Sequence, residues 1–328
     1  MQSYTANRFT TAPMLDWTDR HCLYFWRLMT RRTMLYTEMI TTGAIIFSRK
    51  DMLEYNEEER PLALQLGGSC PSDLAKCAKL AEDRGYSEIN LNVGCPSDRV
   101  QNGGFGAALM AKADTVADCF KAMKDTVDIP VTIKCRIGID KLDTYEFLSE
   151  FIETQRDAGC DHLIIHARKA WLEGLSPKEN RDIPPLDYER VYRVKRDFPD
   201  LFISVNGGIT NLKQAGEHLK KVDGVMVGRA AYQDPFMLSR VDTDIFKEEK
   251  NPVETRDEVI EFLLPYAERY VKNGGKLSHI TRHILDLYTG LPGARSFRRI
   301  LSQEAVRAGA GIEVIIRARD AVLKTEQA

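Results

Sequence analysis

The sequence lacks long apolar runs, paired cysteine motifs and an excess of either charge. No run of 18 apolar residues occurs among its 328 residues, so we expect no membrane-spanning helix. The N-terminal stretch MQSYTANRFTTAPML has no charged segment followed by a long apolar one, so we expect no secretory signal. The seven cysteines form no CxxC pair and no cluster with histidine, which argues against a zinc site and a disulfide framework. These absences predict a cytoplasmic protein without a metal site.

The total charge points to no polyanionic partner, because the formal net charge is -2 and the pI is about 6.4. A nucleic-acid partner would have to be recognised through a local basic patch. The chain is 43% hydrophobic, which is enough apolar material for one large domain and a smaller one.

Eight short β-type segments recur along the chain, and each is followed by a segment with helical spacing. Strands that alternate with helices predict parallel pairing, and eight such units predict a TIM (β/α)8 barrel in the α/β class. A doubly wound sheet is the alternative, but residues 12–17 lack the glycine-rich turn that usually follows its first strand. One predicted helix, 72–85, has Ser72 as its expected cap and Gly85 as its stop. The predicted strands span residues 9–15, 35–40, 62–67, 88–93, 131–137, 162–168, 201–206 and 224–228.

The composition changes after residue 240. Residues 241–252 are polar and end in a proline, which predicts a linker. From residue 254 onward no strand-like segment occurs, and four segments with helical spacing are separated by glycine-rich breaks. A small antiparallel helical bundle is the economical interpretation. We therefore predict a barrel domain over residues 1–240 and a helical domain over residues 250–328.

Polar residues and glycines gather at the predicted carboxyl ends of the strands, where barrel enzymes place their active sites. Several have a structural alternative: His166 could be a hydrogen-bonded core histidine, Gln65 a satisfied barrel amide, and Cys95 a buried cysteine. Lys134 is harder to place in a core, because a lysine inside the apolar strand VTIKCRIG needs a partner or a ligand. The strand ends hold Pro13, Met14, Leu15, Gln65, Asn92, Cys95, Lys134, Arg136, His166, Arg168, Asn206, Gly207, Gly208, Gly228 and Arg229.

Glycines at the last two predicted strands give the sharper clue. Barrels often bind a phosphate between these two loops, through exposed backbone N–H groups and a helix N-terminus. Gly207-Gly208 and Gly228 would supply such a site, and Arg229 could add a charge-assisted contact. A phosphate there, with Lys134 placed to stabilise negative charge near N1 and O2 of a reduced flavin, suits flavin mononucleotide (FMN).

The motifs along the whole chain resemble those of the tRNA-dihydrouridine synthases, with no departure at a motif position. The segment EINLNVGCPSDRVQNGGFGAALM at 88–110 is the most specific part. The segment HARKAWLEGLSPKENR at 166–181 and the tail GLPGARSFRRIL at 290–301 look most like the A-type subfamily. Further matching segments are APMLDWTD (12–19), YTEM (36–39), LALQLGG (62–68), IKCRIG (133–138), NGGI (206–209) and VGRAAY (227–232).

The resemblance implies an FMN-binding catalytic barrel followed by a helical tRNA-binding domain, acting as an oxidoreductase on uridines of the tRNA D-loop with NADPH as reductant. The A-type enzymes act on uridines 20 and 20a. The proton donor would be Cys95. The flavin contacts would fall to Pro13, Met14, Leu15, Gln65, Lys134, His166, Asn206, Gly207, Gly208, Gly228 and Arg229.

A thiol suits the chemistry that the resemblance implies. Hydride from flavin N5 should go to C6 of uracil, after which C5 needs a proton. An ordinary thiol has a pKa of about 8.5, so it is mostly protonated at neutral pH and can act as an acid. Asn92 could hold the uracil edge. The glycines Gly103, Gly104 and Gly106 would let the loop that bears Cys95 close over the base.

A local basic patch supplies the RNA-binding signal. Residues 269–319 contain ten Lys or Arg and three acids, a difference of 10 − 3 = +7 in a chain whose total is -2. Such a patch suits phosphate contact, although a solvated helical face is the alternative. We expect Arg295 and Arg298 on one helix face, and Lys178 and Arg181 in the long loop after residue 168, to contact tRNA. Trp171 in the same loop would either stack on RNA or pack against protein.

Two other functions remain open on sequence alone. A flavin oxidoreductase on free pyrimidines, similar to dihydroorotate dehydrogenase, would not require the basic tail. A non-catalytic RNA-binding barrel would not require Cys95, Lys134 and His166 together, nor a flavin. An aldolase or isomerase barrel with Lys134 as Schiff-base amine is a further alternative, and bound flavin would argue against it. We infer no membrane association and no stable protein partner.

Overall fold

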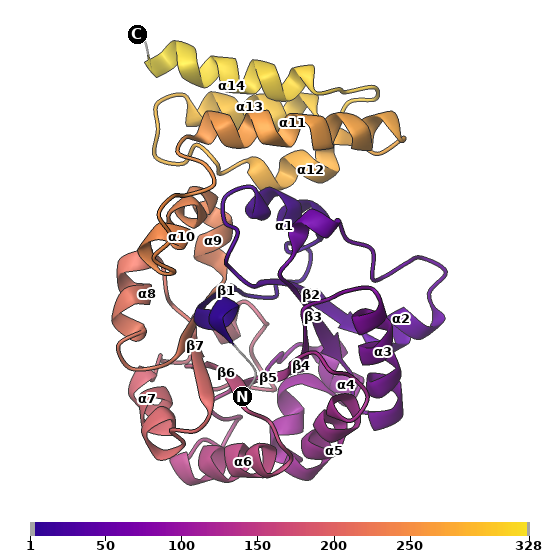
Figure 1. The fold of residues 1–328 in the computed structure, drawn as a ribbon, viewed down its shortest axis with the longest axis vertical. Helices are drawn as coiled ribbons and strands as arrows, with labels where there is room; N and C mark the ends of the chain where they lie inside the picture. Colours follow the sequence, from indigo (N-terminus) through magenta and orange to yellow (C-terminus); the bar gives the residue numbers. More distant parts are fainter. Residues whose placement is uncertain (1–3, 327–328) are drawn as a thin grey trace.

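Residues 4–326, which the computed structural model describes, form a barrel of eight parallel strands and a separate bundle of helices (Figure 1). The strands hydrogen-bond in the order β1-β8-β7-β6-β5-β4-β3-β2. A bridge between Thr10 and Met34 joins β1 to the segment before β2 and closes the ring. The predicted TIM (β/α)8 class is confirmed. The strands are β1 Phe9–Thr11, β2 Leu35–Thr41, β3 Leu62–Gly67, β4 Glu88–Val93, β5 Val131–Arg136, β6 His162–His166, β7 Phe202–Asn206 and β8 Gly224–Val227.

Strand β1 ends at Thr11, short of the predicted Leu15. Pro13 has no amide hydrogen with which to continue the ladder. The Met14 amide donates instead to the hydroxyl of Thr18 at 3.0 Å. Residues 12–18 therefore form a loop at the mouth of the barrel, and this loop lines the cavity there.

Helices cover the outside of the barrel (Figure 1). Helix α3 corrects one prediction: Cys70, not Ser72, is its N-cap, because Pro71 takes the first helical position, where a missing amide hydrogen costs nothing. Gly85 follows the helix with a φ of 84°, as a stop signal should. The barrel helices are α1 Arg20–Arg27, α2 Thr42–Phe47, α3 Pro71–Asp83, α4 Asp98–Asn102, α5 Ala113–Lys124, α6 Tyr145–Asp157, α7 Tyr188–Asp197, α8 Leu212–His218, α9 Arg229–Gln233 and α10 Val241–Asp244.

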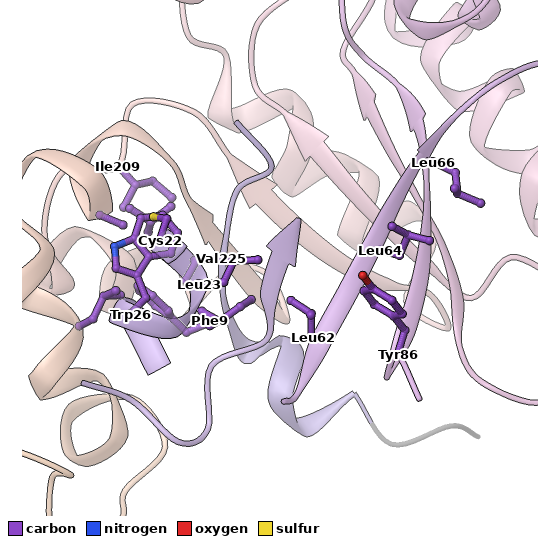
Figure 2. Close-up of a cluster of buried hydrophobic side chains, with 14 of the residues drawn as sticks. Phe9, Cys22, Leu23, Trp26, Leu62, Leu64, Leu66, Tyr86, Ile209 and Val225 are labelled. Carbon is purple, nitrogen blue, oxygen red and sulfur yellow. The ribbon is translucent and has the colours of Figure 1, made fainter. Parts of the chain in front are cut away.

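Side chains alternate across the barrel wall, because successive residues of a strand point to opposite faces. Leu62, Leu64 and Leu66 of β3 lie together in the apolar layer between strands and helices (Figure 2). Between them, Ala63 and Gln65 face the barrel interior, where Ala63 packs in a smaller cluster and Gln65 bonds to side chains of β4. Strand β4, with the sequence EINLNV, likewise directs its three polar side chains inward. The interior of this barrel is therefore unusually polar along β3, β4 and β5.

The C-terminal helices form the predicted bundle and contact the barrel at α1 (Figure 1). Tyr24 of α1 stacks on Tyr266 with ring centroids 3.9 Å apart, and His21 Nδ1 lies 2.6 Å from the Tyr266 hydroxyl. Within residues 4–326, no helix combines the length and the apolar character needed to cross a membrane. The bundle helices are α11 Arg256–Lys272, α12 Leu277–Ile284, α13 Ala294–Glu304 and α14 Glu313–Glu326.

The segment 241–252 is not the free linker that its polar composition predicted. It begins with α10, and Asp242 of that helix is buried. The Asp242 carboxylate accepts hydrogen bonds from the Thr30 hydroxyl at 2.6 Å and the Arg31 amide at 2.8 Å. These donors to Asp242 lie 212 and 211 residues away in the sequence. Composition alone therefore could not distinguish this buried, hydrogen-bonded carboxylate from a solvated one.

Candidate active site

A cavity of about 1500 Å³ lies at the carboxyl ends of the strands. Ligand pockets usually measure roughly 300–1000 Å³, so this one is larger than a typical pocket for a single small ligand. All predicted site residues except Lys178, Arg295 and Arg298 line it. The predicted residues that line it are Pro13, Met14, Leu15, Gln65, Asn92, Cys95, Lys134, His166, Arg181, Asn206, Gly207, Gly208, Gly228 and Arg229.

Cys95 stands on the turn that follows β4. The side-chain oxygen of Asn92 accepts hydrogen bonds from the amides of Gly94 at 3.2 Å and Cys95 at 3.0 Å, which fixes the turn. The thiol is half-buried, lines the cavity, and has the Ser97 hydroxyl 3.5 Å away. The alternative of a buried core cysteine is therefore wrong for Cys95, whereas it holds for Cys22, Cys77, Cys119, Cys135 and Cys160.

Gly106 is required by close packing beneath that turn. Its φ is 75°, and a Cβ there would lie 2.5 Å from the carbonyl oxygen of Cys95. The Ala107 amide donates to the same carbonyl at 2.9 Å. The structure thus gives Gly106 a fixed supporting position under Cys95, and the loop closure over the base stays a prediction.

Two cations and a histidine reach the cavity from β5 and β6. The ammonium group of Lys134 donates to Asn206 Oδ1 at 3.1 Å. Burial and the nearby charge of Arg136 lower the pKa of Lys134 to about 8. Burial, helped by the charges of Arg136 and Lys134, also lowers the pKa of His166 well below its usual value. The cavity therefore contains a neutral imidazole beside an ammonium group that titrates near physiological pH.

Arg136 was noted in the sequence at a strand end but given no role, and the structure gives it one. Its guanidinium group donates to the carbonyls of Gly94 at 3.1 Å, Lys169 at 3.1 Å and Asn180 at 2.9 Å. These carbonyls belong to the loops after β4 and β6, the two neighbours of β5, so one buried cation joins the Cys95 turn to the loop after β6. The signal in the sequence was its spacing: Arg136 is two residues after Lys134 and shares its face of the strand.

The glycines after β7 have positive φ angles and tight surroundings. Gly207 has a φ of 110°, and a Cβ there would lie 2.5 Å from the ring of His166. Gly208 has a φ of 71°, and a Cβ there would lie 2.7 Å from the Tyr188 hydroxyl. Gly228 is the N-cap residue of the short helix α9. Arg229, predicted to contact a phosphate, forms an ion pair with Asp182 at 2.7 Å, so a bound anion would share it with that carboxylate.

The long loop after β6 is folded around the side chain of Asn180. This amide donates to the carbonyls of Trp171 at 2.8 Å and Leu175 at 3.1 Å, and accepts from the Trp171 amide at 2.8 Å. Arg181 reaches the cavity, where burial and the charge of Arg229 lower its pKa. Lys178 is exposed and lies outside the cavity lining.

Trp171 is packed on one face, because the ammonium group of Lys169 lies 4.2 Å from its ring centroid. The indole is 36% exposed, so Trp171 both packs against Lys169 and keeps surface on which a base can stack.

The bundle carries the remaining predicted contacts, at a distance from the cavity lining. Arg295 and Arg298 lie on α13, where both are exposed, and Arg298 pairs with Asp286 at 3.1 Å. The basic patch is more neutralised than the sequence suggested, because partners outside the counted window join it. The bundle ion pairs are Lys272–Glu268, Arg282–Asp19, Arg298–Asp286, Arg317–Glu304 and Arg319–Asp320.

Known sequences match nearly the whole chain. Residues 10–323 match the family profile described as dihydrouridine synthase (Dus). A protein of Shewanella oneidensis named tRNA-dihydrouridine(20/20a) synthase is 64% identical over 307 residues, which cover 94% of this chain and 91% of that protein. A protein of Yersinia pestis with the same name is 62% identical over 313 residues, covering 95% of this chain and 90% of that protein.

Solved structures match the barrel. The complex of 2-naphthoyl-CoA reductase with 2-naphthoyl-CoA superposes with a TM-score of 0.56 at 14% sequence identity, covering 71% of this chain and 49% of that one. At this identity the likeness concerns the fold, and it supports the TIM-barrel architecture.

Proposed function

The chain belongs to the dihydrouridine synthase family, and on that premise we propose that it reduces the C5=C6 bond of uridine in the tRNA D-loop to 5,6-dihydrouridine, with bound FMN and with NADPH as reductant. The names of the relatives point to positions 20 and 20a as the targets. One observation carries most weight: Cys95 on the turn after β4, Lys134 of β5 and His166 of β6 reach the same cavity.

The cavity fits a flavin in volume and in chemistry. It offers a half-buried ammonium group, Lys134, whose one hydrogen bond leaves it able to face a ligand, and the glycine pair Gly207 and Gly208 after β7, which also lines the cavity. Lys134 would hold the pyrimidine side of the flavin ring and stabilise negative charge there. The other proposed flavin contacts are Pro13, Met14, Leu15, Gln65, His166, Asn206, Gly228 and Arg229.

When bound, the flavin supplies hydride to C6 of the uracil ring. Cys95 is the proposed proton donor to C5, since its thiol lines the cavity on a turn that Asn92 and Arg136 hold in place. A positioned acid contributes about 10²–10⁴-fold to such a step. Asn92 is also the proposed contact for the uracil edge, through the Nδ2 hydrogen that it does not donate to Gln65.

The substrate base must leave the folded RNA to reach the barrel mouth, so we expect it to be turned out into the cavity. Arg181 at the cavity and Lys178 on the same loop are the proposed contacts near the base. Arg295 and Arg298 of α13 are the proposed contacts for a more distant part of the tRNA backbone. In this arrangement residues 1–240 form the catalytic barrel and residues 250–328 the tRNA-binding domain, and the protein acts in the cytoplasm without a stable protein partner.

The purified chain tests these points together. It should be yellow with a flavin absorbance spectrum, NADPH should bleach it, and unmodified tRNA should restore the colour. Free uridine and orotate should not restore the colour. Mass mapping of tRNA from cells that lack the protein should show uridine in place of dihydrouridine at positions 20 and 20a. A colourless protein that binds tRNA would instead support an RNA-binding barrel, and reoxidation by orotate would support a pyrimidine oxidoreductase.

A further inference from the structure

A buried carboxylate lies inside the barrel, below the cavity, and has no part in the proposed chemistry. Glu88 is completely buried and forms no ion pair with any residue in 4–326. Three donors converge on it: the Tyr36 hydroxyl, the Thr132 hydroxyl at 2.7 Å and the Asn7 amide at 2.7 Å. Burial raises the pKa of Glu88, and the three hydrogen bonds oppose that rise. In its ionised form the carboxylate is acceptor-only and can accept from all three donors.

The Thr132 hydroxyl connects Glu88 to the polar side chains that lie closer to the cavity. It has a single hydrogen, for which the Glu88 carboxylate at 2.7 Å is a nearer acceptor than the Ile89 carbonyl at 3.4 Å, so toward a neighbouring donor it can only accept. That neighbour is Asn90, whose Nδ2 donates to Thr132 Oγ1 at 2.8 Å. The orientation of the Asn90 amide is thereby set, with its oxygen facing away from Thr132.

Two further amides continue the series in the same sense. Gln65 Nε2 donates to Asn90 Oδ1 at 2.8 Å, and Asn92 Nδ2 donates to Gln65 Oε1 at 2.8 Å. The Asn92 oxygen is then turned toward the amides of Gly94 and Cys95, from which it accepts. Every link is a side-chain hydrogen bond between completely or almost completely buried groups, where an unmatched donor or acceptor is costly.

We propose that Glu88 and Thr132 are positioning residues that fix the donor–acceptor direction of this buried hydrogen-bond series, and thereby the orientation of Gln65 and Asn92 and the geometry of the Cys95 turn. A reversed series would place the Asn92 amide hydrogens against the amide hydrogens of Gly94 and Cys95, so the turn could not form its present hydrogen bonds. The catalytic consequence rests on the proposed function, whereas the geometric claim concerns this chain alone.

Three substitutions separate direction from packing. Thr132→Val keeps the shape but removes the hydroxyl, so the series loses its link to Glu88. Thr132→Ser keeps the hydroxyl and should restore the behaviour of the unchanged protein. Tyr36→Phe is the matched control, because it removes a donor to the same carboxylate that lies outside the series. All three are measured on the full chain as purified.

The first measurement is amide hydrogen exchange of the peptide that contains Gly94 and Cys95. We expect Thr132→Val to speed exchange there by about tenfold, the factor that corresponds to loss of one hydrogen bond, while Thr132→Ser and Tyr36→Phe leave it unchanged. The second is the rate at which tRNA reoxidises the reduced flavin, which should fall by about tenfold in Thr132→Val with little change in KM. If Thr132→Val does not fold, Glu88→Asp, which withdraws the carboxylate from Thr132, should give the same two changes.

Equal exchange rates in Thr132→Val and Tyr36→Phe would overturn the positioning role and leave only packing. A protein without flavin or tRNA activity would refute the proposed function but would still give the exchange result, so the two failures are distinguishable. Normal exchange with slowed reoxidation in Thr132→Val would also contradict the inference, because the effect would not pass through the Cys95 turn.

Discussion

At the scale of single residues, the cavity contains two cations whose charged forms are destabilised by burial, and one thiol, Cys95, on a turn that hydrogen bonds hold in place. Lys134 and Arg136 are side by side on one strand face, and burial lowers the pKa of each, to about 8 and about 10. Arg136 is compensated by three carbonyl oxygens, whereas Lys134 has one amide oxygen. The poorly compensated cation is the one available to a negatively charged ligand.

Replacing Cys95 with alanine should leave flavin binding intact and slow reoxidation of the reduced flavin by tRNA by about 10²–10⁴-fold, because C5 of uracil loses the proton donor that we propose for it. Stopped-flow absorbance measures this rate. Cys70→Ala is the matched control, since Cys70 also lines the cavity and is exposed, and its rate should not change. A normal rate in Cys95→Ala would mean that another group supplies the proton.

Replacing Lys134 with methionine should stabilise the flavin-free chain at pH 7. The folded pKa of about 8 lies below the usual 10.5, so the unfolded chain binds the proton more tightly and the charged lysine opposes folding. That penalty, up to about 3 kcal/mol, is fully present below pH 8 and disappears as the pH rises through 10.5. Urea unfolding at pH 7 and pH 10 should therefore show a gain in the free energy of unfolding that shrinks at the higher pH.

The matched control for Lys134→Met is Lys121→Met, at an exposed position of α5. It should change the free energy of unfolding by no more than about 0.5 kcal/mol. The same Lys134→Met protein should bind flavin more weakly. A Lys134→Met protein that is less stable at pH 7 would show that the ammonium group is better compensated than its surroundings indicate.

At the scale of elements, two segments that look irregular in the sequence are each organised by one buried polar side chain. Asn180 holds the loop after β6 through the carbonyls and amide of its own segment. Asp242 holds α10 against residues 30–32. In such segments satisfied buried hydrogen bonds add to the apolar contacts, which in α10 include buried Val241.

Replacing Asp242 with alanine should lower the free energy of unfolding by about 2–4 kcal/mol, because buried donors of Thr30 and Arg31 lose their acceptor. Asp244→Ala, in the same helix but exposed, is the control and should cost about 0.5 kcal/mol or less. Chemical denaturation measures both. Equal effects of the two substitutions would show that α10 is not anchored through Asp242.

At the scale of the whole molecule, the bundle is fixed to the barrel beside the cavity mouth. Asp19 caps α1 by accepting from the amides of His21 and Cys22, and the same carboxylate pairs with Arg282 of α12 at 2.5 Å and lies 3.0 Å from His283. Asp19 also lines the cavity. Deleting the bundle would strip this carboxylate of its partners, so substitutions on α13 test the tRNA contact more cleanly than a truncation.

Replacing Arg295 and Arg298 together with alanine should weaken tRNA binding and make the dependence of log Kd on log salt shallower by about 1 to 2, with the rate at saturating tRNA retained. Binding titrations across salt concentrations measure the slope. Arg156→Ala with Arg196→Ala removes two exposed arginines from α6 and α7 and is the matched control, with no expected change in slope. An unchanged slope in the α13 variant would exclude phosphate contact by these two residues.

The sequence by itself determined the barrel, the bundle and the residues that gather at the strand ends. Period-two and helical patterns are local, so eight strands could be counted from them, and the parallel topology then brings Cys95, Lys134 and His166 to one rim. Only the tertiary structure decided which polar groups meet. The pairing of Arg229 with Asp182, the burial of Asp242 and the series from Glu88 to Asn92 join residues whose adjacency depends on strand register and loop path. A hydrogen-bond partner lies elsewhere in the chain, and nothing in the neighbouring sequence specifies it.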